Sequence, residues 1–360
     1  MKYYYLHVDS AKENHAGSKA VSDCENIMAN LGYKKIKISS PKFKKIRFIA
    51  KIEKAMQLLI LSYLPKNSVL VIGHPIYIRR NYFKILRKLH KKNIKLVFLI
   101  HDLESLRQLS PNSYLFERDY EMYKIADYII AHNNKMKEYL IDKCGVSENK
   151  IIELGVFDYL VNNTKECINT GNSKDNYKDN IELIVAGNLS YEKSGYVYNL
   201  ASVLPDNMSL NLYGVNFDEK RSTSNSSNCK YMGTFDADEL PDIISGSYGI
   251  VWDGPSVDRC EGNAGNYLKY NNPHKVSLYI AAGIPIIIWN QAAMADFVKE
   301  NKIGIAVESL SEIPFRLSRI TYDEYAEFKK NIMNLSKKIK SGYFLTNALK
   351  VIDFNKATNG

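Results

Sequence analysis

Short apolar runs alternate with longer amphipathic segments along most of the chain, and this rhythm limits the possible folds more than any other feature. Five runs in the first half are typical of β-strands, at residues 3–8, 34–38, 68–73, 95–100 and 128–132. Five segments have helical spacing, at residues 19–31, 47–64, 79–90, 115–126 and 135–143. Runs such as VLVIG and LVFLI are apolar throughout, as in strands that are covered on both faces of a parallel sheet. The pattern predicts an α/β fold of the doubly wound class.

The same rhythm restarts after a polar segment, residues 164–180, which has no apolar period. Strands are expected at residues 181–188, 208–214, 248–254, 284–290 and 303–308, and helices at residues 237–244, 274–282 and 294–301. Two further helices are expected near the end, at residues 323–340 and 344–351. We therefore expect an N-terminal domain over residues 1–163, a linker over 164–180 and a second domain over 181–360, which includes the terminal helices.

Charge differs between these two halves. Residues 1–163 contain 28 Lys and Arg against 16 Asp and Glu, whereas the remaining residues contain 21 against 23. The excess predicts that the first domain meets an anionic partner.

The five cysteines are odd in number and form no C-x-x-C pair. No signal peptide precedes the first strand, and no window is apolar enough to span a membrane. We expect a cytoplasmic protein without disulfides or structural zinc.

The two nucleotide fingerprints most common in such folds are missing, which argues against a dehydrogenase and a P-loop ATPase. The informative stretch is GNYLKYNNPHKVSLYIAAGIPIIIW, residues 265–289. In it, Asn272 can cap a helix, Pro273 suits the first helical position and Gly283 can end the helix. A well-capped structural helix accounts for these three residues.

Two cations in the first turn of that helix require a different explanation. His274 and Lys275 stand where the helix dipole is positive, which is unfavourable unless an anion lies between them. A diphosphate there would meet backbone N–H groups, the dipole and the Lys275 ammonium group. The sequence therefore predicts a phosphate site at this helix start.

Other strand ends in the second domain point to the same edge of the sheet. Asn188, Ser190 and Lys193 follow one strand, and Tyr213 ends the next. Tyr213 packs either against a nucleobase or as an aromatic cover over the core. The polar loop over residues 253–266 is either a mobile flap or an exposed connection.

Polar residues also follow strands of the first domain. Gly17 and Ser18 lie in NHAGSKA, a loop that follows the first strand and opens the first helix or forms only a tight structural turn, and His74 follows another strand. His101, Asp102 and Glu104 follow the next one, and such clusters are candidates for acid–base work. Alternatively, His101 and Asp102 only hydrogen-bond a loop.

Two basic stretches, residues 42–54 and 79–92, carry aromatic and aliphatic residues at helical spacing. They fit either a peripheral contact with an anionic membrane or ordinary solvated helix faces. We expect no nucleic-acid partner, because Phe48 and Phe83 fall at core-facing positions and no RNA- or DNA-binding motif is present.

Over nearly its whole length the sequence resembles bacterial glycosyltransferases of the GT-B architecture. The resemblance rests on YYYLHVDSAKENHAGSKA, LVFLIHDLESLR, ADYIIAHNNKMKEYL, AGNLSYEK and, most specifically, the 265–289 block. More narrowly, the chain looks like the cytosolic glucosyltransferases that extend N-acetylglucosamine (GlcNAc) on serine-rich repeat adhesins, which are often grouped with galactofuranosyltransferases. The resemblance implies two Rossmann-like domains facing a cleft, a nucleotide sugar held by the second domain and an acceptor held by the first. It also implies a homo-oligomer, dimer or tetramer, and no metal.

The resemblance also assigns roles to residues of the second domain. It gives Asn271, Asn272, His274 and Lys275 to the UDP phosphates, Tyr213 to the uridine, and the loop with Asn188, Ser190 and Lys193 to the diphosphate. Many retaining GT-B enzymes have two glutamates eight positions apart, but Lys269 stands eight residues after Glu261. This departure argues against a retaining mechanism of that type.

We therefore expect transfer of a hexose, glucose first, from a UDP-sugar to a GlcNAc-bearing protein. Asp102 or Glu104 is expected to be the base, and Gly17, Ser18, His74 and His101 are expected to lie beside the acceptor. The alternatives are a galactofuranosyl- or N-acetylglucosaminyltransferase of polysaccharide synthesis and a non-catalytic partner of a true transferase.

Overall fold

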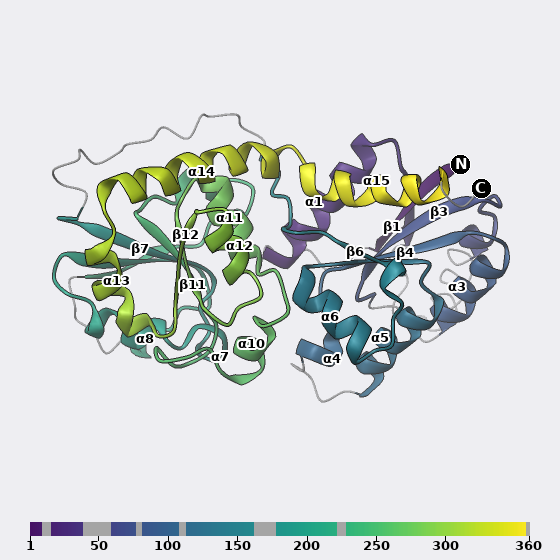
Figure 1. Ribbon diagram of the computed structural model, residues 1–360. Coiled ribbons are helices and arrows are strands. Elements are labelled where there is room, and N and C mark those ends of the chain that lie inside the picture. Colours follow the sequence, from purple (N-terminus) through teal and green to yellow (C-terminus); the bar gives the residue numbers. More distant parts are fainter. Residues whose placement is uncertain are drawn as a thin grey trace. The chain divides into compact units, whose positions relative to one another are not determined.

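The computed structural model describes residues 1–8, 16–38, 59–76, 81–107, 113–161, 178–221 and 228–357. The chain divides into two compact units (Figure 1). The first comprises Met1–Glu13, Val21–Gly155 and Leu345–Gly360, and the second comprises Asn14–Ala20 and Val156–Phe344. This division differs from the expected ranges, because the C-terminal segment belongs to the first unit and residues 14–20 belong to the second. The predicted linker lies mostly outside the described residues.

The first unit is built on a parallel sheet whose described strands run in the order β2-β1-β3-β4-β5-β6. Figure 1 shows α1 and α15 on one side of this sheet and α3, α5 and α6 on the other. Its strands are β1 (Lys2–Val8), β2 (Lys34–Ile38), β3 (Ser68–His74), β4 (Lys95–Ile100), β5 (Tyr128–Ala131) and β6 (Ile151–Glu153). Its helices are α1 (Ala16–Asn30), α3 (Asn81–Lys91), α4 (Glu104–Arg107), α5 (Ser113–Ile125), α6 (Asn134–Asp142) and α15 (Tyr343–Ala357).

The second unit has its own parallel sheet, with the described strands in the order β12-β11-β10-β7-β8-β9. The strands are β7 (Ile181–Asn188), β8 (Met208–Val215), β9 (Cys229–Gly233), β10 (Tyr248–Val251), β11 (Ile286–Trp289) and β12 (Gly304–Val307). The helices are α7 (Tyr191–Ser194), α8 (Val197–Leu200), α9 (Leu240–Ile243), α10 (Gly262–Tyr267), α11 (His274–Ala282), α12 (Ala295–Glu300), α13 (Ile313–Arg319) and α14 (Tyr322–Lys340). The strand order reverses between β7 and β10, and ligands of such sheets bind at this switch point.

The predicted α/β doubly wound class is confirmed in both units, and most elements lie within a few residues of their expected positions. The helix expected over residues 47–64 is described only at its end, over residues 59–62. Two strands escaped the sequence analysis for physical reasons. β6 has only three residues, and β9 is an edge strand whose side chains are largely exposed, so neither carries a clear apolar period.

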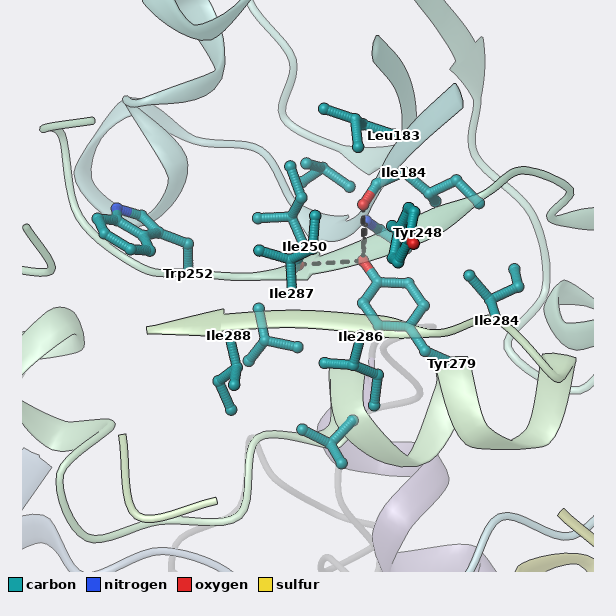
Figure 2. Packing of buried hydrophobic residues seen from close by; sticks show 14 of the residues in the cluster. Leu183, Ile184, Tyr248, Ile250, Trp252, Tyr279, Ile284, Ile286, Ile287 and Ile288 are labelled. Carbon is teal, nitrogen blue, oxygen red and sulfur yellow. Dashed lines mark hydrogen bonds between the residues drawn. The ribbon is translucent and has the colours of Figure 1, made fainter. Parts of the chain in front are cut away.

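Central strands of both sheets are buried along their whole length, as their continuous apolar runs predict. All four residues of β5, β10 and β11 are buried. In the second unit, Ile286, Ile287 and Ile288 of β11 pack with Ile250 and neighbouring residues into one core (Figure 2). The burial of these strands leaves their carboxyl ends as the places where polar side chains can gather.

The basic helix α3 has the composition expected of a solvated helix packed on the sheet. Its apolar side chains Tyr82, Phe83, Leu86 and Leu89 are buried in the core. Its lysines and arginine face solvent. The apolar face of this helix is therefore not available to a membrane.

The other basic stretch, residues 42–54, lies outside the described residues. In the part of the chain that the structure describes, no helix is both long enough and apolar enough to cross a bilayer.

Gly214 provides a test of the packing at the strand ends. It has φ = +138°, and a Cβ atom there would lie 1.8 Å from the carbonyl oxygen of Gly187. We expect Gly214→Ala to lower the free energy of unfolding of this unit by about 3 kcal/mol or more, because backbone strain and a backbone clash combine.

Gly262→Ala is the matched control, since Gly262 also has positive φ (+70°) but no atom within 4 Å of the added carbon. Its loss should be about 1–2 kcal/mol, from strain alone. Urea unfolding followed by tryptophan fluorescence reports on this unit, because both tryptophans, Trp252 and Trp289, lie in it. Equal losses in the two variants would contradict the close approach of β7 and β8.

Candidate functional site

Helix α11 starts and ends where the sequence predicts, but Asn272 does not cap it. Pro273 occupies the cap position with extended backbone (φ −66°, ψ 131°) and makes no side-chain cap hydrogen bond. Gly283 ends the helix in the left-handed conformation (φ 69°), as expected. The prediction for Asn272 was wrong by one position, because the backbone turns into the helix at Pro273. The cap residue itself therefore supplies no side-chain acceptor to the start of α11.

Tyr279 fixes this helix to the sheet. Its hydroxyl accepts a hydrogen bond from the Ala186 amide (3.0 Å) and lies 3.2 Å from the Ile184 carbonyl and 3.3 Å from the Ile250 carbonyl (Figure 2). These three partners belong to β7 and to β10, the strands at the switch point. Lys275 precedes Tyr279 by four residues and therefore lies on the same face of the helix. The anchoring of Tyr279 thus directs Lys275 toward the switch point.

Lys275 meets two other charged residues there, and we call the three the Lys–Asp–Lys group. The Lys275 ammonium lies 3.0 Å from Oδ1 of Asp253 and donates to the Trp252 carbonyl at 3.0 Å. The Lys193 ammonium lies 3.1 Å from Oδ2 of the same carboxylate. Asp253 follows β10, whereas Lys193 lies in α7, shortly after β7. The site therefore combines the loops of the two switch-point strands with the start of α11.

Burial shapes the charges of this group. The side chains of Asp253 and Lys275 are 6% and 10% exposed, and that of Lys193 is 39% exposed. Burial alone would raise the pKa of the Asp253 carboxyl, but Lys193 and Lys275 outweigh it and hold that pKa below its ordinary value. Burial lowers the pKa of the Lys275 ammonium, and nearby Lys193 lowers it further, against the effect of Asp253.

This geometry corrects one premise of the sequence analysis. Lys275 was expected to be an uncompensated cation in the first turn of the helix, in need of an outside anion. The structure supplies Asp253 as its partner. One carboxylate is nevertheless shared between two ammonium groups, so the group as a whole is cationic.

The loop after β7 is held together by its own polar residues. The Asn188 side chain accepts hydrogen bonds from the Ser190 amide (3.0 Å) and from the Asn216 side chain (3.0 Å). Ser190 precedes α7 without making a side-chain cap. The Lys193 carbonyl accepts from the Gly254 amide at 2.7 Å, which joins this loop to the one after β10. Asn188 and Ser190 thus shape the loop that presents Lys193.

The loop over residues 253–266 is an exposed connection only in part, since Asp258 and Arg259 are exposed. Asp253 and Cys260 are buried, and residues 262–267 form α10. Gly195 packs so closely that a Cβ there would lie 2.9 Å from Cα of Pro255. The loop is therefore packed against the segment that carries Lys193.

His274 stacks on Tyr159, with ring centroids 5.0 Å apart and an interplanar angle of 26°. Lys19 of α1 lies 5.0 Å from the centroid of the same Tyr159 ring. Its ammonium donates to the Leu160 carbonyl (2.7 Å) and pairs with Asp238 (2.6 Å). Lys19 thus connects the start of α1 to Asp238 and to the segment that carries Tyr159.

The interpretation that NHAGSKA opens the first helix is confirmed for Gly17 and Ser18, and neither residue lies in a loop. Both are part of α1, which begins at Ala16, and they belong by their contacts to the second unit. The helix simply starts earlier than its apolar period indicates.

Of the two interpretations of Tyr213, the structure agrees with the aromatic cover over the core. Tyr213 is 3% exposed and packs in the core, with its ring centroid 6.1 Å from that of Phe235. The structure supports the alternative of an aromatic cover over the core and gives no exposed ring face for a nucleobase. Asn271 and Asn272 lie directly before α11, with Asn272 buried and Asn271 half-buried.

In the first unit, the carboxyl ends of β3 and β4 bring four of the predicted residues together. The Nε2 atom of His74 lies 2.7 Å from Asp119, and the carbonyl of His74 accepts from the His101 amide at 2.7 Å. Asp102 pairs with Arg107 at 3.0 Å, and both side chains are 32% exposed. Glu104 is 3.9 Å from Arg107, but its side chain is only 6% exposed. Asp102 is thus the more accessible of the two carboxylates.

Burial controls the histidines at this edge. It lowers the pKa of His101 to about 4, with a further contribution from nearby His74. It likewise lowers the pKa of His132 to about 3, helped by His101. Both imidazoles are therefore neutral at pH 7, and Arg107 is an ion-pair partner of Asp102 at this edge.

Sequence reasoning missed four residues that organise these sites: Lys19, Asp119, Asp253 and Tyr279. Asp253 carried a usable signal, since it stands at the carboxyl end of a predicted strand (residues 248–254) in a sheet whose sites lie at strand ends. Asp119 and Tyr279 lie within helices, where nothing in the local pattern marks their partners. Only the folded chain brings those partners close.

Comparison with known proteins places this geometry in a family. Residues 183–352 match the family described as "Glucosyltransferase 3-like, C-terminal domain", and residues 2–156 match its N-terminal counterpart. The chain is 34% identical over 294 residues to the beta-1,6-galactofuranosyltransferase WbbI of Escherichia coli K12, covering 81% of each chain. It is 24% identical over 287 residues to glucosyltransferase 3 of Streptococcus gordonii, covering 79% of each.

A solved structure with the same fold is HepE of Anabaena, determined in complex with UDP and glucose. The two chains superpose with a TM-score of 0.61 at 11% identity, over 99% of each chain. At this identity the likeness concerns the fold alone.

Proposed function

The chain belongs to the glucosyltransferase 3-like family, and from this premise we propose that it transfers glucose from UDP-glucose to a GlcNAc-modified serine-rich repeat glycoprotein. The chain is a glycosyltransferase with two doubly wound domains. The observation that carries the donor part of the proposal is the Lys–Asp–Lys group, a cationic cluster at the switch point beside the start of α11. HepE, which shares the fold, was solved with UDP and glucose, and glucosyltransferase 3 of streptococci shares the family.

The proposed reaction requires fixed positive charge near the donor phosphate, which the Lys–Asp–Lys group provides. The bond between the anomeric carbon and the β-phosphate oxygen breaks, and UDP leaves with the electron pair. Negative charge therefore builds on the β-phosphate, and fixed positive charge there lowers the barrier. Lys275, Lys193 and the start of α11 supply it, and we propose that the reaction needs no divalent metal.

The acceptor oxygen forms the new bond to the anomeric carbon and must lose a proton. We propose Asp102 as the base in an inverting reaction, because it is the accessible carboxylate at the strand ends of the first unit. Glu104, His74 and His101 would then support the acceptor loop. A nucleotide-sugar donor also favours a cytoplasmic site of action.

A second candidate is transfer of galactofuranose to a polysaccharide. The observation that favours it is the higher identity, 34%, to a galactofuranosyltransferase. The phosphate contacts would be the same for either donor, so the two candidates differ in the groups that recognise the sugar.

A donor panel tests the proposed activity. We expect transfer from UDP-glucose to a GlcNAc-bearing serine-rich peptide, detected as a mass increase of one hexose, and full activity in excess EDTA. UDP-galactofuranose and UDP-GlcNAc are assayed in parallel reactions. Faster transfer from UDP-galactofuranose would favour the second candidate. Loss of activity in EDTA that Mn²⁺ restores would contradict metal independence, and no transfer from any donor would indicate a non-catalytic partner.

Lys275→Ala tests the diphosphate site. It removes a charge-assisted contact of about 1.5–3 kcal/mol, so the affinity for UDP should fall roughly tenfold to over a hundredfold. Isothermal titration calorimetry measures it directly.

Lys302→Ala serves as the control for the loss of a lysine. Lys302 lies in the same unit and pairs with Glu327 at the surface, 61% exposed. We expect its UDP affinity to remain that of the wild type. An unchanged affinity in folded Lys275→Ala would place the diphosphate elsewhere.

The role of Asp102 is separable from donor binding. Asp102→Asn should reduce turnover by about 10²–10⁴ and leave UDP affinity unchanged, because a base acts only in the transition state. Glu138→Gln removes an exposed carboxylate of the same unit and should have no effect on turnover. Wild-type turnover in Asp102→Asn would eliminate this base, whereas lost UDP binding would mean that the roles of the two units are assigned wrongly.

A further inference from the structure

We propose that Asp253 is a positioning residue for the donor: its carboxylate fixes Lys193 and Lys275 in place and keeps Lys275 positively charged while the site is still buried and empty of phosphate. This inference rests on the proposed function, since it assumes that the two lysines meet the diphosphate. Nothing in the sequence or the comparisons assigns Asp253 a role.

The Asp253 carboxylate contacts both lysines at once. Each carboxylate oxygen of Asp253 has its own lysine, with Oδ1 3.0 Å from Lys275 and Oδ2 3.1 Å from Lys193. The two lysines come from different elements, α11 and α7, and a long side chain has many rotamers available in isolation. A single carboxylate shared between them holds both ammonium groups at one point, beside the start of α11.

The backbone at Asp253 is closely packed and hydrogen-bonded. The Asp253 carbonyl oxygen would lie only 2.8 Å from a Cβ atom built on Gly265, so α10 packs directly against its backbone. The next residue, Gly254, has φ = +118° and donates its amide to the Lys193 carbonyl at 2.7 Å. The backbone that carries the carboxylate is therefore held in place by its neighbours.

Asp253 also affects the charge of Lys275. Burial lowers the pKa of Lys275, and the neighbouring Lys193 ammonium lowers it as well, whereas Asp253 raises it. The remaining titratable groups near this pair are uncharged at neutral pH, because burial raises the pKa of each: the Cys260 thiol and the hydroxyls of Tyr196 and Tyr279. Among the described groups that act on Lys275, Asp253 is therefore the anion that opposes its deprotonation.

The sign of the expected pH effect follows. A lysine with a lowered pKa is charged below that pKa and loses its charge as the pH rises through it. Asp253→Asn keeps the shape of the side chain but removes its charge, so Lys275 should deprotonate at a lower pH than in the wild type. Below that pH the affinity of the variant should be lower than that of the wild type but should not change with pH, because Lys275 is charged there and the Asn amide can accept from only one of the two ammonium groups. Above it, affinity should fall by about tenfold per pH unit.

The experiment measures the UDP dissociation constant by calorimetry between pH 7 and pH 9.5, above the titration of the UDP phosphates, for wild type and Asp253→Asn. The proposal expects the decline in affinity to begin at lower pH in the variant. Asp253→Glu, which keeps the charge, should restore the wild-type onset. Glu327→Gln, which removes the carboxylate of the exposed pair with Lys302, is the matched control and should follow the wild type.

Lys193→Gln gives an independent test should Asp253→Asn not fold, as judged by thermal unfolding. It should weaken UDP binding at neutral pH through the loss of one cation, yet move the onset of the decline to higher pH, because Lys275 then has the carboxylate to itself. An Asp253→Asn profile parallel to that of the wild type, or an earlier onset in Lys193→Gln, would overturn the proposal. If instead Lys275→Ala leaves UDP affinity unchanged, it is the proposed donor site that fails.

Discussion

A single buried carboxylate, Asp253, holds two ammonium groups at the point where the second sheet reverses its strand order. Lys275 is buried and Lys193 is partly exposed. The two cations repel each other, and the anion between them offsets that repulsion and the poor solvation of Lys275. Asp253 supplies that anion from the loop after β10, which is hydrogen-bonded to the segment that carries Lys193. The result is a preformed, net positive group in a place where sheets of this kind bind their ligands.

The fold supports this group at three places. Tyr279 attaches α11 to β7 and β10 and thereby sets the direction of Lys275 (Figure 2). Close glycine contacts bring the loops after β7 and β10 together, and Asn188 braces the first of these loops. Preorganisation of this kind means that the positive charge need not reorganise when the leaving group becomes negative, which is how fixed charges contribute most to catalysis.

The sequence contained enough to predict the fold class, most elements of the two sheets and the limits of α11, because Pro273, Gly283 and continuous apolar runs act locally. It also marked Lys193 and Lys275. It did not reveal that they share Asp253, since Asp253 is 60 residues from Lys193 and 22 from Lys275 and no local rule links the three. The placements of Tyr213, Gly17 and Ser18 have a similar origin, because burial and the start of α1 depend on contacts between distant segments. The return of the C-terminal segment to the first unit likewise leaves no trace in the apolar period.

The most direct test of the central claim is a crystal structure of the protein with UDP bound. The account predicts that the diphosphate lies at the start of α11, with a β-phosphate oxygen within hydrogen-bonding distance of the Lys275 ammonium and with Asp253 still bound to both lysines. A diphosphate bound at the strand ends of the first unit, beside His74 and Asp102, would contradict it, as would UDP held in the second unit without contact to Lys275.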